Sequence, residues 1–283
     1  MKILLTGSNG QLGLCFQDRI PEGWTLQATD SEELDITDRN KVFSSVSDYR
    51  PDVIVNAAAY TAVDKAETNA GIAALVNAVG PENLAIAAKE IGAMFFHIST
   101  DYVFDGTSKT PYLETDKTNP LGVYGKTKLD GEIAVLDVLP EAIVIRTAWV
   151  FSEYGNNFVK TMLRLSTNAE ELRVIDDQRG CPTYAGDIAQ AIIDMIRIKP
   201  EGGIYNFCGD VEVSWCQFAK TIFDKALEHG KIHVLPRIKP IDTTDYPTAA
   251  VRPMYSSLDG RKIENIGISL SKWQYSLSEV LKK

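Results

Sequence analysis

Residues 3–13 read Ile3-Leu4-Leu5-Thr6-Gly7-Ser8-Asn9-Gly10-Gln11-Leu12-Gly13, and the fold class follows from this run. Its first four residues are a short, mainly apolar segment that is typical of a buried parallel strand. Three glycines follow, and a helix-like segment covers residues 14–20. Glycines let the backbone approach a phosphate, and the free amides of a helix N-terminus face it, so this order forms an anion site. The spacing is G-x-x-G-x-x-G rather than the dinucleotide fingerprint G-x-G-x-x-G. Its place at the first strand–helix junction nevertheless favours nucleotide binding over a plain turn.

Strands and helices alternate over the following half of the chain. Apolar runs predict strands at Thr25–Thr29, Val53–Asn56, 94–99 and 142–147. Between them we expect helices at Arg39–Tyr49, 66–79, 81–91 and 129–139. Asp38 is the expected N-cap of the first of these helices, and Gly80-Pro81 marks a break or bend. The alternation predicts an α/β fold with a Rossmann-type, doubly wound parallel sheet and right-handed crossovers.

The pattern loosens after Trp149, and no clean linker separates the two halves. We expect further helices at 157–167, 184–198, Trp215–Glu228 and 276–282, and strands at 204–207 and 232–235. The sequence therefore predicts a first domain over residues 1–150 and a smaller, interleaved α/β substrate lobe over residues 151–283. Some later segments are expected to pack back on the first domain.

Composition narrows the classes of function. The chain has 283 residues and a net charge of −9, which argues against a nucleic-acid partner and against reliance on anionic membranes. Its four cysteines show neither C-x-x-C spacing nor a disulfide framework, which favours buried thiols in a reducing cytosol. The start is too short for a signal peptide, and we expect no apolar run of membrane-spanning length. These features predict a cytoplasmic protein without a membrane partner.

The segment Tyr124-Gly125-Lys126-Thr127-Lys128 places a phenol and an ammonium four residues apart, on one face of an expected helix. A free tyrosine has a pKa of about 10, and a nearby ammonium lowers that pKa, so the pair can act as one acid–base unit. Such a pair is also a common surface arrangement. Other residues must therefore provide the context that decides whether this pair is catalytic.

That context comes from the carboxyl ends of the predicted strands. Asp30 lies seventeen residues beyond Gly13, near the roughly 20-residue spacing of a carboxylate on an adenosine ribose, although a solvated loop acid would look the same. Ala57-Ala58-Ala59-Tyr60 follows the third strand, where small residues let a flat cofactor lie on the backbone or simply pack tightly. Thr100 ends the fourth strand, over the crevice where ligands bind in open α/β sheets.

Taken together, these motifs resemble the extended short-chain dehydrogenase/reductases, and within them the dTDP-4-dehydrorhamnose reductase family. Seven stretches carry the resemblance, in order and across both halves: 7–13, 56–67, 99–106, 124–128, 146–151, 155–165 and 177–183. The resemblance implies NADPH or NADH as cofactor and a dTDP-sugar as substrate. The implied reaction is reduction of the C4 keto group of dTDP-4-dehydro-L-rhamnose to dTDP-L-rhamnose, the last step of dTDP-rhamnose biosynthesis for cell-surface polysaccharide.

The resemblance also implies residue roles. Thr100, Tyr124 and Lys128 match the catalytic trio: Tyr124 donates a proton, Thr100 hydrogen-bonds the same oxygen, and Lys128 lowers the Tyr124 pKa and bonds the nicotinamide ribose. The cofactor-binding positions are Gly7, Asn9, Gly10, Gln11, Leu12, Gly13, Asp30, Asp35, Ile36, Ala57, Ala58, Ala59, Tyr60, Tyr124 and Lys128. The substrate-binding positions are Thr61, Val63, Thr100, Tyr102, Tyr124, Trp149, Asn156 and Arg252.

Related activities remain as alternatives. A 4,6-dehydratase would carry Asp-Glu directly after the strand-four threonine, whereas Asp101-Tyr102 follows here. Another sugar-nucleotide reductase or an epimerase of the same superfamily is the nearest rival. A non-catalytic NADP-binding regulatory subunit of the methionine adenosyltransferase type is a rival of another class, but the complete trio favours an enzyme.

One departure concerns metal and assembly. Some family members dimerise through Mg²⁺ held by glutamates, one of them shortly after the glycine loop. Here that stretch reads Leu14-Cys15-Phe16, and Asp187 is the nearest acid after the second-half Pro-Thr turn. This argues against a bridging Mg²⁺, and we expect a monomer or a metal-independent homodimer with no metal ligands. Asp30 would repel a 2′-phosphate and so leans towards NADH, but the sequence leaves the cofactor, the nucleoside and the product stereochemistry open.

Overall fold

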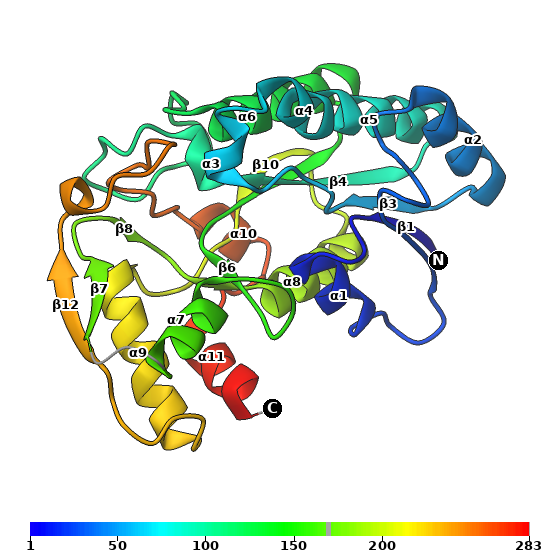
Figure 1. Cartoon of the computed structure of the whole chain (residues 1–283). Helices are drawn as coiled ribbons and strands as arrows, with labels where there is room; N and C mark the ends of the chain where they lie inside the picture. The colour runs from blue at the N-terminus through cyan, green and yellow to red at the C-terminus, as the bar shows by residue number, and fades with distance from the viewer. Residues whose placement is uncertain (168–170, 283) are drawn as a thin grey trace.

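The computed structural model describes residues 1–167 and 171–282 and contains one six-stranded, fully parallel sheet (Figure 1). Its strands are β1 (Lys2–Thr6), β2 (Thr25–Thr29), β3 (Val53–Asn56), β4 (Met94–Thr100), β5 (Ile143–Thr147) and β10 (Gly203–Asn206). Their spatial order is β2-β1-β3-β4-β5-β10. The chain moves from β1 to β2 in one direction and then returns past β1 to β3 in the other. The direction of winding therefore reverses between β1 and β3, the type of point at which open α/β sheets bind ligands. The predicted Rossmann-type parallel sheet is confirmed.

Helices cover both faces of this sheet. In Figure 1, α2 (Arg39–Tyr49), α4 (Ala70–Ala74), α5 (Gly80–Ile91) and α6 (Val123–Val138) lie above it, and α1 (Gln11–Gln17) and α8 (Ala185–Ile198) lie below it. One core packs Leu4 and Ile54 against Leu84 of α5, and the other packs Leu5 and Val55 against Ile192 of α8. Since both faces are covered, β1, β3 and β5 contain continuous apolar runs of three residues rather than alternating apolar and polar ones.

The smaller lobe lies at the lower left of Figure 1 and is built from short elements. Its helices are α7 (Phe158–Ser166), α9 (Trp215–Glu228) and α11 (Trp273–Lys282), whereas α10 (Arg261–Asn265) contacts β10 of the central sheet. Its strands pair as β7 (Glu171–Ile175) with β12 (Arg237–Ile241), β6 (Val150–Phe151) with β9 (Thr183–Tyr184), and β8 (Arg179–Gly180) with β11 (Val213–Ser214). Meanwhile β10 and α8, which also follow residue 150, belong to the layers of the central sheet. The proposed division at residue 150 therefore separates the two parts along the sequence but not in space, because β10 and α8 pack with the first part.

Several elements have the predicted bounds, among them Arg39–Tyr49, Val53–Asn56 and Trp215–Glu228. Asp38 caps α2 by accepting hydrogen bonds from the backbone N–H groups of residues 40 and 41. The strand expected at 232–235 is wrong. Val234 is 78% exposed there, and the strand lies beyond Pro236, as β12. Because β12 pairs only with β7, its free edge tolerates Pro240.

At Gly80-Pro81, where the sequence predicts a break or bend, there is no break, since a helical run continues from Ala70 to Ile91. A π-helical turn, η1 (Leu75–Val79), precedes Pro81. Proline clashes with the carbonyl four residues earlier, here that of Asn77, and the wider π-turn relieves this clash. By length and composition this run of 22 residues could span a membrane, so the expectation that no run reaches that length is corrected. In the structure its α5 part is packed in the core through Leu84 and neighbouring alanines.

Candidate active site

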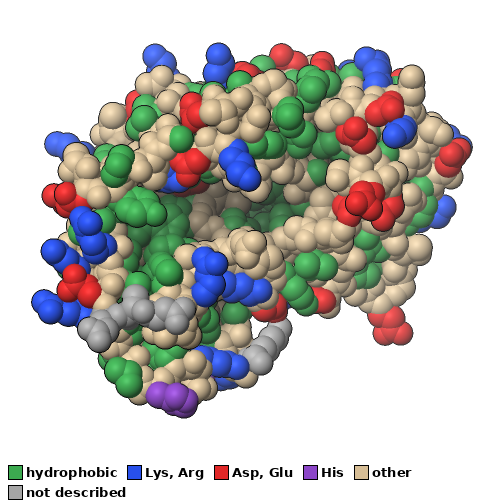
Figure 2. All heavy atoms as spheres, viewed as in Figure 1, with side chains coloured by type: hydrophobic (Ala, Val, Ile, Leu, Met, Phe, Trp, Pro, Cys, Tyr) green, Lys and Arg blue, Asp and Glu red, His purple; other side chains and the backbone are tan. Residues whose placement is uncertain are grey.

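A cleft of about 1010 Å³ opens at the carboxyl ends of β1, β3, β4 and β5. Figure 2 shows it as a hollow in the surface between the helix-covered sheet and the smaller lobe. Gly7, Ala57, Thr100 and Thr147 line it from the ends of these strands, and Trp215 lines it from α9. The cleft therefore lies at the reversal point of the sheet.

The glycine loop forms one end of the cleft. Gly7 has φ +72°, and a Cβ atom there would lie 2.5 Å from the backbone N of Ala58, so only glycine permits this approach of the two loops. A Cβ at Gly13 would lie 2.3 Å from the Gly7 carbonyl oxygen, so Gly13 lets α1 start directly beneath the loop. Gly13 does not line the cleft, unlike the other predicted loop residues Gly7, Asn9, Gly10, Gln11 and Leu12.

Two acids extend the wall beyond this loop. The carboxylate of Asp30 accepts hydrogen bonds from the Asn9 side chain and from the backbone N–H of Glu32, the latter at 2.8 Å. The carboxylate of Asp35 accepts from the backbone N–H of Thr37 at 2.9 Å and from its hydroxyl at 2.8 Å. These bonds hold the pKa of Asp35 below its usual value. Both carboxylates and Ile36, for which the resemblance implies positions around an adenosine, line the cleft.

The loop after β3 is tied to the helices by one buried amide. Asn77, in the π-turn, accepts from the backbone N–H of Tyr60 at 2.8 Å and donates to its carbonyl at 3.2 Å. The same amide donates to the hydroxyl of Thr127 on α6 at 3.1 Å. This arrangement holds the wall formed by Ala57, Ala58, Ala59, Tyr60, Thr61 and Val63. The sequence analysis did not single out Asn77, because its partners lie 17 and 50 residues away.

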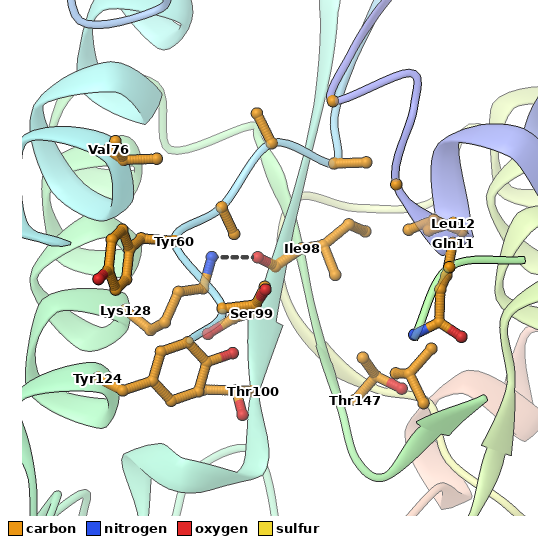
Figure 3. A pocket seen from close by; sticks show the side chains of 18 of the residues that line it. Gln11, Leu12, Tyr60, Val76, Ile98, Ser99, Thr100, Tyr124, Lys128 and Thr147 are labelled. Carbon is orange, nitrogen blue, oxygen red and sulfur yellow. Dashed lines mark hydrogen bonds between the residues drawn. The ribbon is translucent and has the colours of Figure 1, made fainter. Parts of the chain in front are cut away.

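The predicted catalytic trio meets at the end of β4. Helix α6 begins at Val123, earlier than the predicted residue 129, so Tyr124 and Lys128 lie in its first turns. Figure 3 shows both side chains reaching from α6 towards β4, where Thr100 ends the strand. The Thr100 hydroxyl donates to Asp101 at 3.0 Å and accepts from the backbone N–H of Tyr102 at 3.2 Å. The ring of Tyr102 packs edge-on against that of Tyr124, with centroids 5.6 Å apart.

A glycine makes this meeting possible. A Cβ at Gly125 would lie 2.1 Å from the carbonyl oxygen of Tyr102, so α6 approaches the segment after β4 more closely than any other residue would allow. The first backbone N–H of α6, that of Val123, donates to the carboxylate of Glu67 at 2.9 Å. Glycine packing and this cap together fix where Tyr124 and Lys128 stand.

The electrostatics correct one prediction. Burial raises the pKa of Tyr124 to about 12, against a hydrogen bond with Thr100 that lowers it, and Asp101 adds to the rise. Burial also lowers the pKa of Lys128 to about 8. The Lys128 ammonium is turned to the carbonyl oxygen of Ile98, 2.6 Å away (Figure 3). The expectation of a lowered Tyr124 pKa is therefore wrong in this structure, because desolvation of the phenol dominates.

The smaller lobe contributes an aromatic wall. Trp149, at φ +48°, stacks on Trp215 with ring centroids 3.5 Å apart and planes within 6°. A Cβ at Gly180 would lie 2.6 Å from the Trp149 ring, so glycine makes room for the stack. Trp149 and Asn156 line the cleft as predicted, and Tyr102 does so from the opposite part of the chain. Arg252 does not line it, because its guanidinium bonds the carboxylate of Asp64 at 2.7 and 3.2 Å.

Sequence reasoning missed part of the lining. The additional residues are Ser31, Leu34, Thr37, Val76, Ile98, Ser99, Asp101, Thr147, Val150, Gly155, Phe158, Ile188 and Trp215. Ser99, Asp101 and Thr147 adjoin predicted positions and could have been found by proximity to strand ends. Phe158, Ile188 and Trp215 come from helix starts in the second half, where no local pattern points to the cleft.

Within residues 1–167 and 171–282 there is no group of three or more His, Cys, Asp or Glu side chains that could hold a metal ion. Cys15 and Phe16 are buried after the glycine loop. The carboxylate of Asp187 is engaged by the hydroxyls of Ser271 and Ser276, at 2.6 and 2.8 Å.

A family model, sequence relatives and solved structures all relate this chain to one kind of protein. The model of a family described as RmlD substrate binding domain matches residues 1–283. A dTDP-4-dehydrorhamnose reductase of Aggregatibacter actinomycetemcomitans is 45% identical, over 99% of this chain and 98% of that protein. The crystal structure of such a reductase from Clostridium acetobutylicum superposes with a TM-score of 0.94 at 40% identity, covering 99% of this chain and 98% of the other. That of the Bacillus anthracis enzyme, in complex with NADP, gives 0.93 at 36% identity with the same coverage.

Proposed function

The chain belongs to the RmlD substrate-binding-domain family, and we propose that it reduces the C4 keto group of dTDP-4-dehydro-L-rhamnose with NADPH or NADH. The relatives at 36–45% identity carry the name of this reductase, and one of them is a complex with NADP. The observation that carries the proposal is the meeting of Thr100, Tyr124 and Lys128 at the end of β4, in the same cleft as the glycine loop.

The residues of the cleft fit a nicotinamide dinucleotide. The space at Gly7 that a Cβ atom would fill suits a pyrophosphate, which we assign to Gly7, Asn9, Gly10, Gln11 and Leu12, with Gly13 behind them. The adenosine end is assigned to Asp30, Asp35 and Ile36, and the path towards the nicotinamide to Ala57, Ala58, Ala59 and Tyr60. When bound, the reduced cofactor supplies the hydride.

The chain's own residues supply the proton. With a pKa of about 12, Tyr124 is protonated at neutral pH and can donate to the C4 oxygen as negative charge develops there. Thr100 hydrogen-bonds the same oxygen by turning its hydroxyl proton away from Asp101. Lys128 lies on the same face of α6 as Tyr124, four residues on. It would bond the nicotinamide ribose, and its ammonium would favour the phenolate that forms.

We assign the sugar nucleotide to the other half of the cleft, formed by Thr61, Val63, Tyr102, Trp149 and Asn156. The Trp149–Trp215 stack offers this ligand a flat apolar wall. Arg252 reaches a bound nucleotide only by leaving Asp64, so its contact with substrate requires an exchange of partners.

The central test is turnover of dTDP-4-keto-sugar with each nicotinamide, followed by identification of the product. Tyr124→Phe should keep cofactor affinity and lower kcat by roughly 10²-fold or more. Tyr275→Phe, at a site that is 68% exposed on α11, is the matched control and should leave kcat unchanged. Near-normal turnover in Tyr124→Phe would remove Tyr124 from the mechanism. Tight NADP(H) binding without any turnover by the wild type would instead favour a non-catalytic binding protein.

For assembly and location we propose a monomer or a metal-independent homodimer in the cytoplasm, without nucleic-acid or membrane partners. The hydroxyl bonds to Asp187 and the buried Cys15 and Phe16 support the absence of a bridging Mg²⁺. Size measurement with and without a chelator tests this, and a dimer that dissociates in chelator would contradict it.

A further inference from the structure

A chain of buried polar side chains runs behind Lys128, outside the cleft lining. Thr6, Asn56 and His97 stand on the neighbouring strands β1, β3 and β4, and their exposed fractions are 1%, 0% and 0%. The Thr6 hydroxyl donates to Asn56 Oδ1 at 2.8 Å, Asn56 Nδ2 lies 3.0 Å from His97 Nδ1, and His97 Nε2 lies 3.4 Å from Lys128 Nζ. This series of hydrogen-bonded side chains ends at Lys128, a residue of the proposed catalytic trio. The proposed mechanism gives no role to Thr6, Asn56 or His97.

The orientation of the Asn56 amide follows from a donor that cannot reverse. The backbone N–H of Ala58 lies 3.1 Å from one end of this amide, and a backbone N–H can only donate. That end must therefore be the oxygen, which also accepts from Thr6. The NH₂ end consequently faces His97.

The amide in turn fixes the state of the imidazole. Because an amide NH₂ only donates, His97 Nδ1 must accept and carries no proton. A neutral imidazole then has its one proton on Nε2, and a doubly protonated ring would set two donors against each other. Burial and the nearby Lys128 also lower the pKa of His97 well below its usual value.

The Nε2–H of His97 consequently points at Lys128 Nζ. A neutral Lys128 amine can accept a hydrogen bond from this N–H. A Lys128 ammonium cannot, because it has only donor groups and would face the N–H donor of His97. We propose that Asn56 and His97 form a positioning pair: Asn56 locks the tautomer of His97, and the His97 N–H weakens proton binding by Lys128 while leaving its other side to the Ile98 carbonyl.

Other charged groups near Lys128 do not replace this effect. Glu132 lies one turn further along α6 and favours the charged lysine, but its carboxylate is already shared by Arg146, at 2.6 and 2.9 Å, and by Ser99. The remaining titratable side chains of the described cleft lining near the trio are Tyr60, Asp101, Tyr102 and Tyr124. All four stay unchanged in the variants below.

The tautomer can be observed directly, without any assumption about the reaction. The chain has three histidines, so imidazole ¹⁵N spectra are assignable by comparison with a His97 variant. We expect His97 to show the Nε2–H tautomer, without titrating, between pH 5 and pH 9. Asn56→Asp should switch it to Nδ1–H, because a carboxylate accepts where the amide donated. A wild-type Nδ1–H tautomer, or a His97 that titrates with an ordinary pKa, would overturn the proposal.

The effect on Lys128 rests on the proposed function and is read from the pH profile of kcat/KM. Activity that needs the Lys128 ammonium is lost as pH rises through the Lys128 pKa, which burial lowers to about 8. His97→Asn keeps an acceptor for Asn56 but removes the N–H that faces Lys128. The alkaline limb of the pH profile, where activity falls, should therefore move to a higher pH by about one unit. His97→Gln keeps a donor near Lys128 and should hold the limb in place. Equal limbs in wild type and both variants would refute the effect on Lys128, even if the spectra show the expected tautomer. Thermal unfolding of each variant distinguishes loss of the folded state from a shift of the pH profile.

Discussion

Replacing Gly125 by alanine should inactivate the protein through geometry, without removing any reactive group. The added methyl carbon would lie 2.1 Å from the carbonyl oxygen of Tyr102 and 3.1 Å from Cβ of Pro120. Real Cβ atoms essentially never come closer than 3.0 Å, so α6 or the segment after β4 must retreat by about 0.9 Å. Tyr124 adjoins Gly125, and Thr100 lies two residues before Tyr102, so the retreat separates the phenol from the hydroxyl. A misplacement near 1 Å costs on the order of 10²-fold in rate, and overpacking costs about 1–3 kcal/mol of stability.

The assay measures kcat at saturating cofactor and substrate, together with NAD(P)H affinity and the free energy of unfolding. We expect Gly125→Ala to lose kcat and stability while the cofactor still binds, because the glycine loop lies on another element. Gly71→Ala is the matched control: Gly71 also lies in a helix, and its Cβ would meet nothing within 4 Å. That variant should keep kcat and gain about 0.5–1 kcal/mol of stability. Turnover in Gly125→Ala within twofold of the wild type would refute the claim that this close approach sets the active geometry.

Two further substitutions test the buried charges behind the cleft. Glu132→Gln leaves the buried Arg146 without its carboxylate and should cost about 3–5 kcal/mol in urea unfolding, whereas Glu228→Gln, in an exposed pair with Lys225, should cost less than about 1 kcal/mol. Lys128→Met should abolish turnover but stabilise the fold at pH 7, since the gap between a pKa of about 8 and the ordinary 10.5 corresponds to about 3 kcal/mol. Below pH 8 the folded protein holds a buried ammonium that the unfolded chain solvates, so the advantage of methionine should shrink as pH rises from about 8 to 10.5. A difference in unfolding free energy that stays constant over this range would contradict the buried charge.

Local patterns sufficed to predict the central sheet and its helices, because each signal there lies within a few residues. The first three residues of β3, 53–55, are all apolar since both faces of the sheet are covered. Asp38 is a recognisable N-cap residue directly before α2. The paired strands of the smaller lobe give weaker signals. Residues 171–175 alternate between exposed and buried positions, but over only five residues. Arg237–Ile241 carries charges and a proline that only a free strand edge tolerates.

The same distinction holds for the cleft. The glycine loop and the Tyr124–Lys128 spacing are local and could be predicted, as could hydroxyls at strand ends. Trp215 was missed because it reaches the cleft from the start of a helix that only the fold brings there. His97 sits inside an apolar run, and its two side-chain partners lie 41 and 31 residues away, so its part in the site is visible only in three dimensions. The error over the Tyr124 pKa has the same origin, because spacing gives the neighbour but not the burial.

The raised pKa of Tyr124 bears on how the protein would restore the proton of this phenol after each turnover. A phenol with a pKa of about 12 holds its proton at neutral pH, which is the state that a donor needs, and the alkoxide formed from a ketone is a stronger base than a phenolate. The burial that raises this pKa makes the phenolate left behind costly. Among the described residues that line the cleft, Lys128 is the one lysine or arginine, so it must compensate that charge. An ammonium with the ordinary pKa of 10.5 is already a stronger acid than this phenol, and one lowered to about 8 passes its proton to the phenolate still more readily and restores Tyr124. Solvent must then return a proton to the amine before the next turnover. The neutral amine that results is the species that the His97 N–H is placed to bond. We therefore infer that the low proton affinity of Lys128, rather than a lowered Tyr124 pKa, prepares this pair for repeated proton donation.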